Sequence, residues 1–123
     1  ITNPTYSAFI AIGRQITYSK QLYSKAKLTG LIQQFQQKQI TERKVYLSAC
    51  IAECEIVLSG QVEPHIKLDF INYPIFTLEE KQFKSEIELL VTYLMKELDQ
   101  NRIVIVFHNE MKIYLTNFYE NFY

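Results

Sequence analysis

The stretch from Thr77 to Thr116 constrains the fold most, because a helical pattern is followed at once by a strand pattern. Thr77 and Glu80 form a Thr-x-x-Glu pair, which is typical of a capping box at a helix N-terminus. Asn101 is a candidate end of the helix, because Asn tolerates the left-handed backbone conformation that often follows a last turn. Between them, apolar residues recur at steps of three and four, which predicts one buried helical stripe. The stripe contains Phe83, Ile87, Leu90, Val91, Leu94 and Leu98.

A β-hairpin is predicted directly after this helix. Residues 102–107 are apolar on both faces and rich in β-branched side chains, which is typical of a central strand. Residues 111–116 alternate between apolar and polar, as expected for a strand with one wet face. His108-Asn109-Glu110 forms the turn between them. We expect the helical stripe to pack on the inward face of this sheet.

The earlier part of the chain carries weaker patterns. Residues 16–40 show helical spacing, with a possible break at Thr29-Gly30. Residues 41–58 also favour a helix, because Leu47, Ile51, Cys54 and Leu58 follow one another at steps of four, three and four, although residues 56–58 could instead open a hairpin.

Shorter segments complete the prediction. Residues 66–70 alternate and predict a strand, and residues 75–76 could add a short one. The apolar segment 5–12 fits either a helix or a strand.

These segments predict an α+β fold with an antiparallel sheet of about four to five strands and helices packed on one face. The expected order is roughly α-α-β-β-(β)-α-β-β, in a single domain over residues 1–123. This order resembles that of the small dimeric chaperones of type III secretion systems, which implies a protein-binding module. No apolar run approaches the about 20 residues that a membrane-spanning helix needs, so we expect no membrane association.

Charge is distributed unevenly along the chain, although its formal net charge is zero. Residues 1–44, the basic and mainly helical part, carry seven basic residues and one acidic residue. Residues 45–123, the acidic α+β core, carry six basic and twelve acidic residues. The basic part could pack on the acidic part of its own chain or of a second copy. The alternative is a nucleic-acid-binding accessory protein, in which phosphate contacts come from Arg14, Lys20, Lys25, Lys27, Arg43 and Lys44.

Residues that could carry chemistry are few. Cys50, Cys54, His65 and His108 could in principle bind zinc, but their spacing matches no standard zinc site and Cys is often a small buried apolar residue. His108 and Glu110 could form an acid–base pair only inside a pocket. No phosphate-binding glycine loop or hydrolase motif is present in the sequence. We therefore predict no catalytic residues, metal or cofactor, and the cysteines favour a reducing, cytoplasmic setting.

Aromatic residues provide the remaining candidate surface. An exposed cluster of aromatic side chains is typical of a protein interface. The sequence therefore predicts a small non-enzymatic protein-binding module, such as an adaptor, immunity protein or chaperone-like factor, that engages a protein partner and forms a homodimer. The expected contact residues are Tyr18, Tyr23, Phe118, Tyr119 and Phe122.

Overall fold

Five strands and two helices form the structure, which is a computed structural model describing residues 6–15, 21–73 and 77–115. The strands form one sheet in the order β2-β3-β1-β4-β5, and neighbouring strands are antiparallel. The α+β class with helices and an antiparallel sheet is therefore confirmed. Along the chain, the elements are β1 (Ser7–Gly13), α1 (Lys25–Arg43), β2 (Cys50–Leu58), β3 (Gln61–Ile71), α2 (Glu80–Glu97), β4 (Arg102–Phe107) and β5 (Met111–Leu115).

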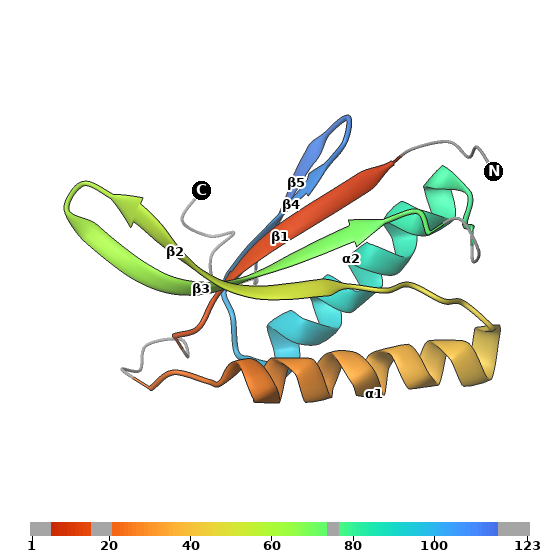
Figure 1. The fold of residues 1–123 in the computed structure, drawn as a ribbon, viewed down its shortest axis with the longest axis horizontal. Helices are drawn as coiled ribbons and strands as arrows, with labels where there is room; N and C mark the ends of the chain where they lie inside the picture. The colour runs from red at the N-terminus through yellow and green to blue at the C-terminus, as the bar shows by residue number, and fades with distance from the viewer. Residues whose placement is uncertain (1–5, 16–20, 74–76, 116–123) are drawn as a thin grey trace.

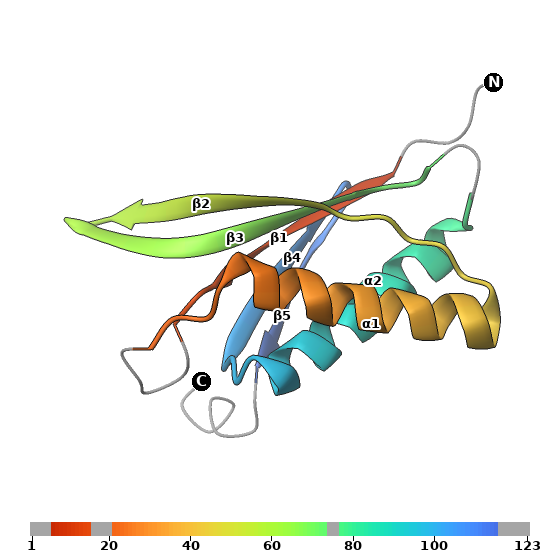
Figure 2. The same ribbon diagram turned by 60° about the horizontal axis from the view of Figure 1, so that its bottom comes forward.

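Both helices lie on the same side of the sheet, as Figures 1 and 2 show. The central strand β1 pairs with β3 on one side and β4 on the other, so the inward side chains of these three strands form one apolar floor. The stripe of α2 packs into the same core. The core residues whose side chains are no more than 1 % exposed include Ile10, Ile12, Ile66, Leu68, Ile103, Ile105, Phe83, Ile87 and Leu94.

Helix α2 confirms the predicted apolar stripe, but its two ends differ from the prediction. The helix begins at Glu80 after Glu79, and Glu79 makes no side-chain capping hydrogen bond. The Asn72 side chain instead accepts from the Leu78 N–H at 2.9 Å, just before the helix. At the other end, Asp99 rather than Asn101 adopts the left-handed conformation, with φ of 51°. Asp tolerates this conformation almost as well as Asn.

Helix α1 starts later than predicted and runs without a break through Thr29-Gly30. Ser24 caps it by accepting from the Lys27 N–H at 3.1 Å. Only Leu28 and Ile32 are fully buried on this helix, one turn apart. Most of α1 therefore lies at the edge of the core, which explains its glutamine-rich sequence.

The prediction of a helix over residues 41–58 is wrong, because β2 occupies residues 50–58 as an edge strand. Beyond the start of α1, the β2–β3 hairpin projects with no helix beneath it (Figures 1 and 2). Both of its faces meet water there, so its sequence lacks the alternation that marks a half-buried strand. Its two-residue turn, Ser59-Gly60, has φ of 51° and 79°, which matches the twist of a tight hairpin.

The remaining predictions concern shorter segments. The apolar segment 5–12 falls largely in strand β1, and the predicted hairpin at residues 102–116 forms β4 and β5. The possible strand at residues 75–76 lies outside the described residues. Among the helices described, neither is long and apolar enough to cross a membrane.

Candidate functional site

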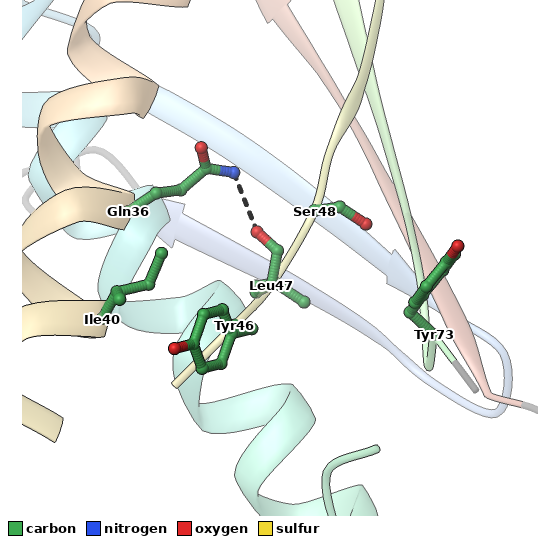
Figure 3. A pocket seen from close by; sticks show the side chains of 6 residues that line it. All are labelled: Gln36, Ile40, Tyr46, Leu47, Ser48 and Tyr73. Atoms are coloured by element: carbon green, nitrogen blue, oxygen red, sulfur yellow. Dashed lines mark hydrogen bonds between the residues drawn. The ribbon is translucent and has the colours of Figure 1, made fainter. Parts of the chain in front are cut away.

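A pocket of about 440 Å³ opens between the C-terminal half of α1 and the chain that leads from α1 into β2. Figure 3 shows Gln36 and Ile40 on α1, the extended segment 46–48 beside them, and Tyr73 on the far side of that segment. Tyr73 follows the end of β3, so three separate parts of the chain form the pocket. Its lining residues are Gln36, Ile40, Tyr46, Leu47, Ser48 and Tyr73.

The end of α1 creates this pocket by reversing the chain. Lys44 adopts a left-handed conformation, with φ of 54°. Its N–H donates to the Ile40 carbonyl at 3.0 Å, and the Val45 N–H donates to the Gln39 carbonyl at 3.3 Å. Val45 then turns into the core, with 4 % exposure. The Gln36 side chain donates to the Leu47 carbonyl at 2.8 Å, which holds the extended segment against the helix. Backbone hydrogen bonds at the end of α1 and the Gln36 amide therefore hold the segment that lines the pocket against the helix.

A second, smaller cavity of about 10 Å³ shares Gln36 and Leu47 with the pocket. The Glu86 carboxylate of α2 lines this cavity with only 1 % exposure. Its Oε1 forms an ion pair with Arg43, the last residue of α1. The same atom makes no geometrically regular hydrogen bond among the described residues. This pair joins α1 to α2 at the smaller cavity, which Glu86 lines.

The chemistry of the pocket suits a flat, mostly apolar ligand with a few polar atoms. Tyr46 and Tyr73 are 40 % and 44 % exposed and present aromatic rings, while Ile40 and Leu47 add aliphatic surface. The polar groups are the Gln36 amide, the Ser48 hydroxyl and the tyrosine hydroxyls. No lysine, arginine or carboxylate appears in this lining among the described residues, so ligand recognition here depends on stacking and neutral hydrogen bonds.

Of the five predicted contact residues, the structure describes only Tyr23. Its ring lies in the core with 3 % exposure, and its hydroxyl donates to the Gly13 carbonyl at 2.7 Å. Burial raises the pKa of the Tyr23 hydroxyl strongly, and nearby Arg14 opposes this shift. Tyr23 is therefore a buried structural residue and not a surface contact. The others, Tyr18, Phe118, Tyr119 and Phe122, lie outside the described residues.

The predicted basic residues do not form one patch in the described structure. Arg14 donates from Nε to the Tyr23 carbonyl at 3.0 Å, and Arg43 pairs with Glu86 on α2. Lys44 terminates α1, while Lys25 and Lys27 lie at the opposite, N-terminal end of that helix. Lys20 lies outside the described residues. The Arg43–Glu86 pair is one contact in which the basic part packs on the acidic part of its own chain.

The four residues considered as zinc ligands lie in two places. Cys54 and His65 face each other across β2 and β3, and Cys50 is farther along the same strand. His108 lies instead at the β4–β5 turn, where its ring nitrogen is 3.0 Å from Glu80. No cluster of three metal-binding side chains occurs in the part of the chain that the structure describes.

His108-Asn109-Glu110 forms the predicted turn, and its side chains fasten the hairpin to α2. Lys84 of α2 donates to Asn109 at 2.7 Å and to Glu110 at 3.1 Å. Glu80 accepts from Asn109 at 3.2 Å and lies beside His108. The hydrogen bond from Lys84 is the main reason that the pKa of Glu110 lies below its usual value. This solvent-exposed network is structural, and it borders none of the pockets described above.

Replacing Glu110 with glutamine is expected to reduce stability slightly at neutral pH and not at acidic pH. A lowered pKa in the folded state means that the ionised carboxylate stabilises the fold above the usual value of 4.5. This contribution is lost as the pH falls through the lowered pKa. The effect is small because exposed ion pairs are screened by water. Urea unfolding of the wild type and Glu110→Gln at neutral pH and at about pH 3 measures it. Glu53→Gln, an exposed carboxylate on β2, is the control, and a pH-independent difference for Glu110→Gln contradicts the prediction.

The residues that form the pocket were not predicted from the sequence. Gln36 sits in a glutamine-rich run, and Tyr46 and Tyr73 are two of nine tyrosines, so no residue type or spacing distinguishes them. Asn72-Tyr73-Pro74 indicated a break after a strand. Tyr73 is far from Gln36 in the sequence, so the sequence does not show that the two residues line the same pocket. Only the tertiary structure brings these residues together.

Comparison with solved structures reveals the same fold in an enzyme. A phage SAM lyase in complex with S-methyl-5'-thioadenosine aligns with a TM-score of 0.72 and 15 % sequence identity, over 94 % of this chain and 92 % of that one. The apo state of a phage SAM lyase aligns with a TM-score of 0.66 and 16 % identity, over 91 % and 90 % of the two chains. No family model and no curated protein matches the sequence.

This finding contradicts the prediction of a small non-enzymatic protein-binding module, because the solved structures that share the fold are those of an enzyme. The physical reason for the error is that an active site can be built without any recognisable sequence motif. The residues that line the pocket match no catalytic sequence motif, so they gave no signal that could have indicated an enzyme.

Proposed function

We propose that this protein is a lyase that cleaves S-adenosylmethionine and that the pocket between α1 and β2 binds the nucleoside half of the substrate. The observation that carries the proposal is the likeness to the phage SAM lyase over more than nine-tenths of both chains. The reducing cytoplasm, which suits two free cysteines, is the proposed location.

The reaction follows from the chemistry of the substrate. S-Methyl-5'-thioadenosine is what remains of S-adenosylmethionine when the bond between sulfur and the Cγ of the amino-acid arm breaks. A lyase adds no water, so the substrate's own carboxylate forms a new C–O bond to Cγ. The electron pair of the C–S bond moves to the sulfonium sulfur, which becomes a neutral thioether, and the other product is homoserine lactone.

This reaction needs no general acid or base. The nucleophile is already an ionised carboxylate, and the leaving thioether is neutral and takes no proton. The protein contributes by holding the arm folded, with the carboxylate oxygen about 3–3.5 Å from Cγ and in line with the C–S bond. A negative and a positive charge cancel in the transition state, so an environment less polar than water favours it. The aliphatic and aromatic lining of the pocket fits this requirement.

Stacking on Tyr46 or Tyr73 would hold the adenine, because every base presents a π-face to an aromatic side chain. The Gln36 amide, held by the Leu47 carbonyl, and the Ser48 hydroxyl would contact the polar edges of the nucleoside. The pocket volume of about 440 Å³ falls in the range of small-molecule sites.

The test is incubation of the purified protein with S-adenosylmethionine, followed by chromatography and mass spectrometry for S-methyl-5'-thioadenosine and homoserine lactone. Tyr46→Ala is expected to raise KM by about tenfold, since stacking contributes about 1–3 kcal/mol per base. Tyr46→Phe keeps the ring and is the matched control, with KM close to that of the wild type. Absence of both products removes the lyase proposal. Products formed equally well by Tyr46→Ala and by Tyr73→Ala retain the lyase and reject this pocket.

A further inference from the structure

Glu86 on α2 is the one charged residue that is buried in the part of the chain that the structure describes. A carboxylate in the interior is costly unless charged or hydrogen-bonding groups surround it. Its Oε1 pairs with Arg43, and this atom makes no geometrically regular hydrogen bond to the described residues. An ionised carboxylate can accept about four hydrogen bonds, so one ion pair uses only part of this capacity. Glu86 therefore has the properties of a binding group as well as those of a structural one.

The cavity that Glu86 lines has the size of a single small polar group. Its volume of about 10 Å³ corresponds to about one water molecule, and an ammonium group is of similar size. The polar side chains of its lining are Glu86 and the amides of Gln36 and Gln39, and the other lining residues are apolar. An ammonium group has three N–H donors, which these oxygens can accept. The cavity therefore suits a compact cation and excludes a bulky one.

The cavity adjoins the pocket, because Gln36 and Leu47 line both. Figure 3 shows these two residues and the hydrogen bond that joins them. Of the described residues that line either space, Glu86 alone is charged. A ligand that fills the pocket and carries a primary ammonium group on a short aliphatic chain therefore matches both spaces.

We propose that Glu86 binds the α-ammonium group of the substrate's amino-acid arm, in the cavity that adjoins the pocket. This inference rests on the proposed lyase function, which places the nucleoside half of the substrate in the pocket. Arg43 keeps its contact with Oε1 of Glu86, and the ammonium group donates to the remaining acceptor positions of the carboxylate. The Arg43 side chain is 43 % exposed, so water also solvates its charge while the carboxylate is shared.

The chemistry of the arm explains why the ammonium group belongs in this cavity. The sulfonium has three carbon substituents and no N–H donor, so it neither fits a cavity of about 10 Å³ nor donates to Glu86. The α-carboxylate is repelled by the negative charge of Glu86 and stays free to attack Cγ. Holding the ammonium group fixes Cα, to which the carboxylate is attached, and so favours the folded arm that cyclisation needs.

Isothermal titration calorimetry with two stable ligands tests the proposal. S-Adenosylhomocysteine keeps the amino-acid arm but has a neutral thioether, which would have to leave as a thiolate, and S-methyl-5'-thioadenosine has no arm. Glu86→Gln is expected to weaken the binding of S-adenosylhomocysteine by about tenfold, because a hydrogen bond between two charged groups is lost. The affinity for S-methyl-5'-thioadenosine is expected to stay unchanged.

Glu88→Gln is the matched control. Glu88 lies on the same helix, but its carboxylate accepts from Lys112 and lines neither the pocket nor the cavity. This variant is expected to bind both ligands with wild-type affinity.

The possible results separate this site from the proposed function. Unchanged affinity for S-adenosylhomocysteine in Glu86→Gln overturns the ammonium site and leaves the lyase and its pocket standing. An equal loss for both ligands also overturns it, because Glu86 would then only shape the pocket. A wild type that binds neither ligand removes the pocket and the ammonium site together, and product formation from S-adenosylmethionine then decides separately whether the protein is a lyase.

Wild-type protein provides a second measurement if Glu86→Gln does not fold. An analogue of S-adenosylhomocysteine with hydrogen in place of the α-ammonium group is expected to bind about tenfold more weakly than the parent compound. Equal affinities of the wild type for the two compounds overturn the proposal.

Discussion

Arg43→Met is expected to lower the free energy of unfolding by about 3 kcal/mol, because it leaves the Glu86 carboxylate buried without its charged partner. The Glu86 side chain is 1 % exposed, whereas the Arg43 side chain is 43 % exposed, so the carboxylate depends on the pair more than the guanidinium does. Arg43 also donates to Gln39 at 2.8 Å, one helical turn away, which aligns it toward α2. Urea unfolding followed by circular dichroism measures the loss.

A second substitution separates the lost charge pair from lost packing. Adding Glu86→Leu to Arg43→Met removes the buried charge and is expected to recover most of the stability, since an apolar pair of similar size is often as stable as a buried ion pair. Lys38→Met, elsewhere on α1, should change stability by less than about 0.5 kcal/mol. Equal losses in the single and double variants would mean that the loss comes from packing at these positions and not from the unpaired buried charge. The pocket shares Gln36 and Leu47 with the cavity that Glu86 lines, so it should also lose ligand affinity in Arg43→Met.

Leu94→Ala is expected to destabilise the protein by about 2–5 kcal/mol, whereas Leu89→Ala on the same helix should cost less than about 1 kcal/mol. The two substitutions remove the same atoms from α2, but Leu94 is 0 % exposed and Leu89 is 43 % exposed. Leu94 belongs to the core formed by α2 and the inward faces of β1, β3 and β4, so its loss leaves a cavity.

Chemical denaturation of the two alanine variants under identical conditions provides the comparison. An unchanged slope with denaturant indicates that only the folded state is affected. Comparable costs at the two positions would contradict the burial of the helical stripe. The pair therefore also tests the orientation of α2 on the sheet.

The predictions from sequence were correct for segments whose local residue pattern indicates which side is buried. The stripe of α2 requires one covered side, and steps of three and four indicate that side directly. The hairpin of β4 and β5 was also predicted, because β-branched residues and a polar turn are local signals. Segment 41–58 failed because its helical spacing carries no information about an edge strand exposed on both faces.

The candidate site could not be predicted from the sequence for a related reason. Its walls come from α1, the segment 46–48 and the end of β3, which meet only after the chain reverses at Lys44. Gln36 and Tyr73 have no special character as residue types, and their role depends on what lies across the pocket. Likewise, the isolated Glu86 reads as an ordinary helix surface residue until Arg43 is placed beside it.

The sequence by itself determined the α+β class, the position and inward side of α2, the β4–β5 hairpin and the division into basic and acidic parts, because each depends on residues close together in the chain. The tertiary structure alone decided the sheet order β2-β3-β1-β4-β5, the burial of Tyr23 and Glu86, and the pocket. These features depend on contacts between distant segments, and the free energy of such contacts is set by what covers each surface rather than by local spacing.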